Sequence, residues 1–300
     1  MGNTFYLNWE PVLMVWLQNL LGEAGVFVAT FVTMLGEETV MVAILGFIYW
    51  CYDKKFGVYV GTNLMVGMVA NPMIKNIFFR YRPYMVHSEV KCLKPVHEGD
   101  IYDPVLQGYS FPSGHSSNSS TAYFSLPVYG KKKWLVVIGL LMPFLIGVSR
   151  VCLGVHYPTD VMAGWLLGAV VVMVMTFLQK KIQVKWKLYL LTVLLTVPGY
   201  FYCTSNDYFT CFGMMLGFFA ASLFEEKYVQ FENTKDVKKC IFRVVGGLLV
   251  FLITNMVLKA GFGLIHIEEI SKLLRVIRYG ILVFITMGVY PLVFRIKRIF

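Results

Sequence analysis

Three short islands of polar residues interrupt an otherwise apolar chain, and their side chains are of the types that bind a phosphate and attack it. The islands are Lys75 with Arg82-Pro83, Pro112-Ser113-Gly114-His115, and Ser149-Arg150 with His156 and Asp160. Charged groups close to membrane-length apolar segments are costly, so by default they mark function. Together the islands indicate a phosphate-handling site.

Three fixed cations, Lys75, Arg82 and Arg150, can match the charge of a phosphate monoester dianion without a metal ion. Arginine offers a planar fork that fits two phosphate oxygens, and lysine offers a point charge. Lys75 and Arg82 are seven residues apart, so a continuous helix would place both near one face, with Arg80 off that face. Pro83 is then expected to end the helix.

The second island is expected to begin a helix. A helix N-terminus presents unpaired N–H groups and a positive dipole end to an anion. Ser113 adds a hydroxyl, and Gly114 lets the backbone come close to a phosphate oxygen. His115 would lie beside the same anion.

The third island combines an imidazole with a carboxylate. Pro158 suits the first turn of a helix, and His156 lies just ahead of it. Asp160 is four residues beyond His156, so its carboxylate can reach back to one imidazole nitrogen. That contact would fix the tautomer and leave the other nitrogen free to attack.

The composition indicates a membrane protein. Of 300 residues, 57% are hydrophobic and 15% are charged, whereas a soluble domain carries about 25% charged residues. Nine apolar stretches are expected to span a bilayer: 36–52, 57–78, 115–130, 134–152, 158–178, 188–203, 208–224, 241–260 and 274–294. Residues 8–35 are apolar but broken by Gln18, Asn19, Gly22 and Glu23, and are expected to form interfacial or short re-entrant helices, with one more full span as the alternative.

Lysine and arginine concentrate in the loops on one side of these spans. Short loops rich in these residues stay in the cytoplasm, so the three islands are expected to be extracytoplasmic and the C-terminus cytoplasmic. The net charge of +10 therefore indicates contact with anionic membrane lipids rather than with nucleic acid. The basic loops carry Lys54, Lys55, Lys131, Lys132, Lys133, Lys180, Lys181, Lys185, Lys187, Lys227, Lys235, Lys238, Lys239, Arg295, Lys297 and Arg298.

The identities and spacings of the three islands resemble the type 2 phosphatidic acid phosphatase superfamily, with all three motifs intact. This superfamily includes lipid phosphate phosphatases, bacterial prenyl pyrophosphate phosphatases and glucose-6-phosphatase. The resemblance implies an all-α, polytopic transmembrane helical bundle. Its parts would be N-terminal interfacial or re-entrant helices at 1–35, a six-helix-type phosphatase core at 36–178, and additional C-terminal transmembrane helices at 179–300. The last four spans match no motif that the sequence alone identifies.

The resemblance also implies roles for individual residues. His156 would be the nucleophile and form a phosphohistidine, and Asp160 would orient it. His115 would protonate the leaving alkoxide and then activate water. The phosphoryl oxygens would be held by Lys75, Arg82, Ser113, Gly114 and Arg150. No metal or other cofactor is implied.

The expected function is that of a multi-pass phosphatase of a bacterial plasma membrane. It would hydrolyse a phosphate monoester or pyrophosphate of a lipid or isoprenoid, without a metal, at an extracytoplasmic site. Two alternatives stay open: a phosphatase for a soluble sugar phosphate, as in glucose-6-phosphatase, and a lipid phosphotransferase that passes the phosphoryl group to an alcohol. A protein that only binds phosphate is disfavoured by the two intact histidines. The sequence leaves the oligomeric state open.

Overall fold

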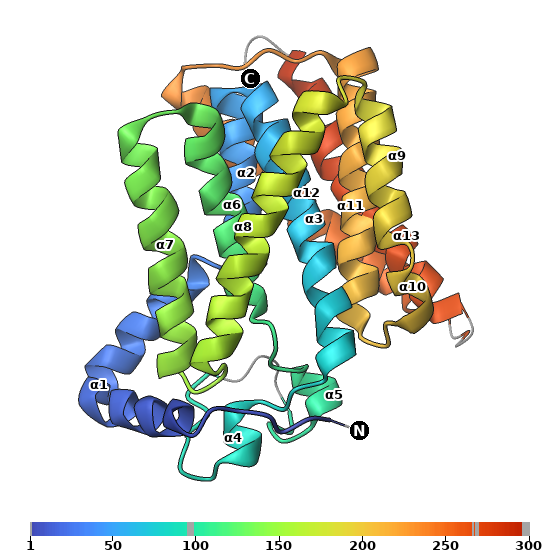
Figure 1. Cartoon of the computed structure of the whole chain (residues 1–300). Helices are drawn as coiled ribbons and strands as arrows, with labels where there is room; N and C mark the ends of the chain where they lie inside the picture. The colour runs from blue at the N-terminus through green and yellow to red at the C-terminus, as the bar shows by residue number, and fades with distance from the viewer. Residues whose placement is uncertain (1, 95–98, 266, 268–269, 296–300) are drawn as a thin grey trace. The chain divides into compact units, whose positions relative to one another are not determined.

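A computed structural model of the chain describes residues 2–94, 99–265, 267 and 270–295. Within these ranges the chain is helical, and its one extended pairing is an isolated bridge between Asn3 and Arg80. The expected all-α class is confirmed (Figure 1). The chain divides into two compact units. The first comprises Met1–Val40, Ala70–Val174 and Cys203–Ser205, and the second comprises Met41–Val69, Met175–Tyr202 and Asn206–Phe300.

The first unit contains all three polar islands. Its helices are α1 (Trp9–Met34), the end of α3 (Lys54–Phe78), α4 (Pro83–Val86), α5 (Pro104–Gln107), α6 (Gly114–Gly130), α7 (Lys133–Cys152) and most of α8 (Pro158–Lys181). Helix α1 is kinked at Gly22, whose φ of 55° and ψ of −167° are not helical. The kink divides the blue helix in Figure 1 into two arms. Glycine adopts such a φ without steric cost, which explains the break at this position.

The second unit contains most of α2 (Glu38–Phe47), α9 (Lys185–Thr196), α10 (Gly199–Tyr202), α11 (Asn206–Phe224), α12 (Val237–Phe262) and α13 (Ser271–Phe284). Helices α11 and α13 pack closely because Gly213 and Gly217 face the backbone of Val276 and Gly280, where a Cβ atom would collide. Small residues at four-residue spacing allow this close approach in membrane helices.

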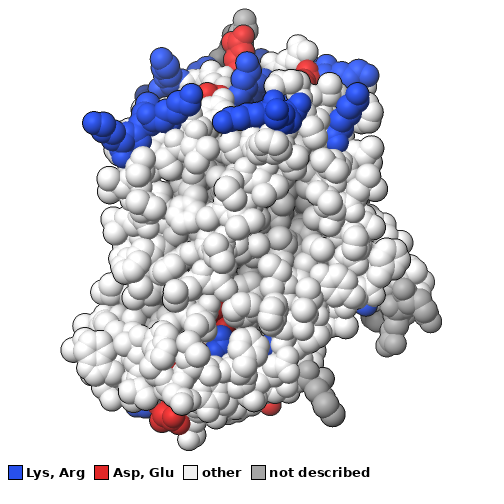
Figure 2. Space-filling view, viewed as in Figure 1, with Lys and Arg blue, Asp and Glu red and all other residues white. Residues whose placement is uncertain are grey.

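Among the residues that the structure describes, six segments are long and apolar enough to cross a membrane: Trp9–Met34, Lys133–Cys152, Pro158–Lys181, Asn206–Val229, Val237–Phe262 and Ser271–Arg295. Four of the nine expected spans are helical but do not meet this criterion. Thr39–Tyr52 and α9 are short, and α6 buries a row of serine residues. Conversely, the segment expected to be interfacial or re-entrant forms the long, kinked helix α1. Figure 2 shows a broad band of this face without lysine, arginine, aspartate or glutamate.

Within the first unit, the basic run and the polar islands lie at opposite ends of two helices. Lys131 and Lys132 lie between the end of α6 and the start of α7. Ser113 precedes the first residue of α6, and Arg150 is in the last turn of α7. The expected basic residues Lys297 and Arg298 lie outside the described residues.

Candidate active site

The first island does not lie on one continuous helix, so the expected shared face of Lys75 and Arg82 is wrong. Helix α3 ends at Phe78, and Phe79 has a left-handed φ of 49°. The N-terminal segment fixes the chain beyond this break. The N–H of Asn3 donates to the Phe79 carbonyl at 2.8 Å, and the Tyr81 N–H donates to the Asn3 carbonyl at 2.9 Å. Lys75 is therefore in the last turn of α3, whereas Arg82 is extended, with φ −71° and ψ 152°.

Arg82 is buried and held by backbone carbonyls on three sides. Its Nη2 donates to Gln107 at 2.8 Å, its Nε to Gly108 at 2.9 Å, and its Nη1 to Val155 at 2.9 Å. The same Nη1 lies 3.5 Å from Nε2 of His156. These contacts fix the guanidinium group beside one nitrogen of the imidazole.

The second island begins helix α6, as expected. Ser113 is its N-cap residue, and the Ser113 hydroxyl oxygen accepts a 2.9 Å hydrogen bond from the hydroxyl of Ser116. Its backbone N–H donates to the carbonyl of Asp160 at 3.0 Å, which joins the second island to the third. The side-chain amide of Asn71 donates to the carbonyl of Pro112 at 3.2 Å and so ties α3 to the same loop.

The third island places His156 just ahead of α8 and Asp160 in its first turn. Oδ2 of Asp160 lies 3.6 Å from Nδ1 of His156, and both side chains are buried. The Ser110 hydroxyl donates to this oxygen and lies 3.5 Å from the same Nδ1. A carboxylate and a hydroxyl therefore face one imidazole nitrogen, while Arg82 faces the other.

The cations of all three islands act electrostatically on His156. Burial lowers the pKa of His156 well below its ordinary value, and the charges of Arg82, Arg150 and Lys75 lower it further. Both effects disfavour the imidazolium form. His156 is therefore neutral at neutral pH, with an unprotonated nitrogen available for attack.

Arg150 and His115 complete the charged surroundings. Nη1 of Arg150 donates to the Thr33 hydroxyl of α1 at 3.0 Å, and the arginine side chain is buried. A charge on His115 would act on His156, Arg150 and Lys75, so these groups lie near one another. Among the described residues, no hydrogen-bond partner faces the buried Nε2 of His115. A buried polar atom left unpaired in this way calls for an explanation, and a bound substrate would supply a partner.

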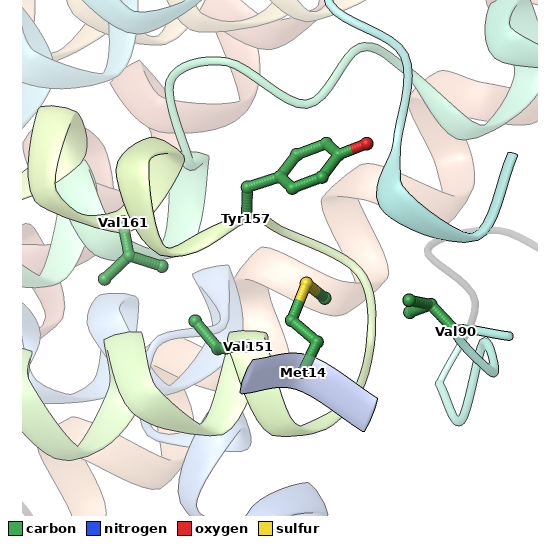
Figure 3. Packing of buried hydrophobic residues seen from close by; sticks show 5 residues of the cluster. All are labelled: Met14, Val90, Val151, Tyr157 and Val161. Atoms are coloured by element: carbon green, nitrogen blue, oxygen red, sulfur yellow. The ribbon is translucent and has the colours of Figure 1, made fainter. Parts of the chain in front are cut away.

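An apolar cluster supports the loop that carries His156. Met14 of α1, Val90, Val151 of α7 and Val161 of α8 are buried together with Tyr157. Figure 3 shows Met14 and Val151 beside the loop that carries Tyr157. This packing holds the residue next to His156 and thereby limits movement of the imidazole.

Sequence reasoning missed Arg80, Glu10 and Ser110. A continuous helix would place Arg80 off the face of Lys75 and Arg82. In the structure its side chain is 1% exposed and lies 2.7 Å from Asp160. Glu10 carries the signal that could have found it, an acid at the start of an apolar helix. Ser110 carries no sequence signal, because a serine in a loop is ordinary.

No group of three or more histidine, cysteine, aspartate or glutamate side chains in the described ranges is arranged to hold a metal ion. The site is instead built from cations and imidazoles. Metal independence stays a prediction from the sequence.

Comparisons with known proteins identify the family of the chain. A model of the PAP2 superfamily matches residues 56–183, and a model described as "PAP2 superfamily phosphatase, transmembrane extension" matches residues 209–299. The second match corrects the expectation that the last four spans match no motif for three of them, 208–224, 241–260 and 274–294, whereas 188–203 lies outside it. Phosphatidylglycerophosphatase B of Bacillus subtilis is 31% identical over 169 residues, which cover 52% of this chain and 76% of that protein.

An undecaprenyl-diphosphatase of Sulfolobus acidocaldarius is 29% identical over 140 residues, 46% of this chain; the match spans 63% of the length of that relative. The crystal structure of Aquifex aeolicus LpxE superposes with a TM-score of 0.50 at 26% identity, covering 59% of this chain and 99% of that one. The apolar helices of the described residues and the match to a transmembrane extension define an integral membrane protein. The chain belongs to the PAP2 superfamily, so the resemblance expected from the sequence is confirmed.

Proposed function

We propose that this protein is an integral-membrane phosphatase that hydrolyses a phosphate monoester or pyrophosphate of a lipid through a phosphohistidine on His156. The observation that carries the proposal is the asymmetric setting of this imidazole. Asp160 and Ser110 face Nδ1, and the Arg82 guanidinium lies 3.5 Å from Nε2. A phosphate held by Arg82 would therefore lie where the Nε2 lone pair can reach its phosphorus.

The first step forms a bond between Nε2 and phosphorus and breaks the bond from phosphorus to the leaving oxygen. His115 would give its proton to that oxygen. In the second step His115 takes a proton from water, the hydroxide oxygen forms a bond to phosphorus, and the P–N bond breaks. Inorganic phosphate leaves and both histidines return to their starting states.

Electrostatic stabilisation comes from the groups that surround the phosphoryl oxygens. Arg82 donates to the backbone carbonyls of Gln107 and Val155, and Arg150 donates to the Thr33 hydroxyl, so both guanidinium groups are fixed in place. Each would donate to phosphate oxygens. Lys75 adds a third positive charge. The N-terminus of α6, which begins at Gly114 directly after Ser113, would add the positive end of its helix dipole. Fixed donors of this kind stabilise charge that develops during transfer without having to reorganise.

A lipid substrate and an extracytoplasmic site have separate support. The names of the relatives, phosphatidylglycerophosphatase and undecaprenyl-diphosphatase, specify phosphorylated lipids. The run Lys131–Lys133 lies at the ends of α6 and α7 opposite the site, and basic loops stay in the cytoplasm. A phosphate at headgroup depth would then enter from the outer face.

The test is a substrate panel with purified protein in detergent. Phosphatidate, a prenyl diphosphate, phosphatidylglycerophosphate and glucose 6-phosphate are offered separately, and free phosphate is measured. We expect release from one or more lipids and none from the His156→Ala variant, with Lys132→Gln at the far end of the helices as the active control. Release from the sugar phosphate alone would contradict the lipid assignment. Transfer to an added alcohol in preference to water would identify a phosphotransferase.

A further inference from the structure

A buried ion pair between Glu10 and Arg80 lies directly behind Asp160. Nη2 of Arg80 lies 3.0 Å from Oε2 of Glu10, and Nη1 lies 2.7 Å from Oδ1 of Asp160. The exposed fractions of these side chains are 1% for Arg80 and 0% for both acids. Isolated charges at such depth are prohibitively costly, so each group depends on the others.

The network leaves few polar atoms of these side chains without a partner. Oε1 of Glu10 accepts from the N–H of Thr159 at 2.9 Å and from its hydroxyl at 2.7 Å, and Oε2 accepts from the N–H of Leu7 at 2.8 Å. Nη1 of Arg80 also donates to the Thr159 hydroxyl at 2.8 Å. Several fixed hydrogen bonds at each end confine the guanidinium to one orientation.

Residues near the N-terminus close this network off from solvent. The Arg80 guanidinium is stacked between two rings, 3.9 Å from the centroid of Tyr157 and 4.6 Å from that of Phe5. Asn3 pairs with the backbone on both sides of Arg80. The segment from Asn3 to Glu10 therefore encloses Arg80, the partner of Asp160 Oδ1, although it precedes the residues matched by the family model.

The division of contacts on Asp160 is specific. Oδ1 receives Arg80, whereas Oδ2 receives the Tyr157 N–H at 2.7 Å and the Ser110 hydroxyl and is the oxygen that faces His156. Contacts on both oxygens prevent the carboxylate from rotating about its bond to Cβ. Glu10 neutralises Arg80, so the three groups carry a net charge of −1 rather than zero, and that charge can stabilise an imidazolium on His156.

We propose that Glu10 and Arg80 are positioning residues for Asp160, with Arg80 fixing the direction of its carboxylate and Glu10 preserving its negative charge for His156. This inference rests on the proposed function, because it assigns the pair to the same nucleophile. It makes the N-terminal segment part of the active-site architecture.

The charged and titratable groups that face His156 come from every neighbouring element. They are Lys75 of α3, Arg82 after α3, His115 of α6, Arg150 of α7 and Asp160 of α8. All five are unchanged in the variants below. A shift in the acid limb of the pH profile between variants therefore reports the charge behind Asp160.

The experiment compares Glu10→Gln, Arg80→Lys, Arg80→Gln and the double variant Glu10→Gln/Arg80→Gln on one substrate across pH. Matched controls are Glu225→Gln and Arg243→Gln in the second unit. Glu225 is 2.7 Å from Lys54, and buried Arg243 donates to the carbonyls of Trp50 and Glu232. The controls measure what loss of a buried charge does to the melting temperature and activity in general.

These variants distinguish the effect of the net charge behind His156 from the effect of the orientation of the Asp160 carboxylate. In Glu10→Gln we expect the acid limb of kcat/KM to move to lower pH, by up to about one unit, because the net charge behind His156 rises to zero. In the double variant the acid limb returns towards its wild-type position. Its kcat is nevertheless below the wild-type value, because Arg80 no longer holds the Asp160 carboxylate. Arg80→Lys keeps the wild-type limb and loses part of kcat, and it remains informative if Arg80→Gln does not fold.

Two results would overturn the inference. The first is an acid limb that stays in place in Glu10→Gln. The second is a loss of kcat in the Arg80 variants that only parallels the loss of melting temperature seen in the controls. Failure of the proposed function is a different outcome: wild-type protein would release no phosphate, or His156→Ala would remain active.

Discussion

Oδ2 of Asp160 lies 3.6 Å from Nδ1 of His156, and neither side chain is exposed to solvent. The separation exceeds an ordinary hydrogen bond, and the Ser110 hydroxyl occupies the space beside it. Catalytic contacts of this kind are often long before the substrate binds and shorten when charge develops. In the proposed mechanism this pair would stabilise a proton on Nδ1 when Nε2 bonds to phosphorus.

Replacing His115 by alanine should impair phosphoryl transfer in a way that depends on the leaving group. An alkoxide needs a proton as the ester bond breaks, whereas p-nitrophenolate leaves without one. We expect kcat for a lipid alkyl phosphate to fall by about 10²–10⁴-fold and kcat for p-nitrophenyl phosphate to fall much less. Steady-state rates on the two substrates provide the measurement. Equal losses on both substrates would contradict the role of His115 as the acid.

Arg82→Lys should be strongly defective although it preserves the charge. Three carbonyls hold the guanidinium group, and one ammonium group cannot satisfy them and also bind two phosphate oxygens. We expect kcat/KM to fall by about 10²-fold, close to the effect of removing one fixed donor from an anion site. Lys132→Arg, the same kind of exchange at the far end of α6, is the matched control. A wild-type value in Arg82→Lys would show that charge alone suffices.

The acid limb of the kcat/KM profile should lie below pH 6.5. Burial and the charges of Arg82, Arg150 and Lys75 lower the pKa of His156 below this ordinary value. A lowered pKa means that the folded enzyme binds the proton less readily, so the nucleophile stays neutral as the pH falls through 6.5. The same sign makes folding less stable in acid, because the unfolded chain takes up the proton first.

Ionisation of the substrate phosphate also affects such a profile, so two substrates with different phosphate pKa values should be compared. An acid limb that lies at the same pH for both substrates reports a group of the enzyme. A fixed limb above pH 6.5 would contradict the assignment to His156.

Chelation should leave the activity unchanged, and vanadate should inhibit it. The cations of the site can neutralise a phosphoryl group, and vanadate adopts the five-coordinate geometry of the transferring phosphorus. Phosphate release after dialysis against EDTA, with and without added Mg²⁺ or Zn²⁺, is the measurement. Activity that disappears with EDTA and returns with metal would refute the metal-free mechanism.

The spacing within islands was a good guide where the expected helix is present. Ser113 does cap α6, and Asp160 does lie one turn from His156. The prediction for the first island was wrong because it assumed that Lys75 and Arg82 lie on one continuous helix. Helix α3 ends at Phe78, and a backbone pairing with Asn3, more than 70 residues earlier in the chain, directs the next residues. Contacts between such distant segments leave no periodic signal in the sequence.

The apolar stretches of the sequence predicted where helices lie, but several of these helices are too short or too polar to count as membrane spans. Helix α6 carries buried serine residues whose hydroxyls bond to backbone carbonyls, for example Ser120 to Gly164 of α8 at 3.2 Å. Such serines lower the hydropathy of a helix that is nevertheless well packed. Arg80 shows the converse: a charge that the spacing places off the face of Lys75 is buried and paired with acids from α1 and α8.

The most direct test of the account is to trap the covalent intermediate. Purified protein is mixed with substrate labelled with ³²P at the transferred phosphate, quenched within the first turnover, and digested for peptide mapping. The account predicts label that is stable to alkali and labile to acid on the peptide that contains His156, and its absence in His156→Ala. Label on a different residue, or rapid turnover in the His156→Ala variant, would contradict the central claim.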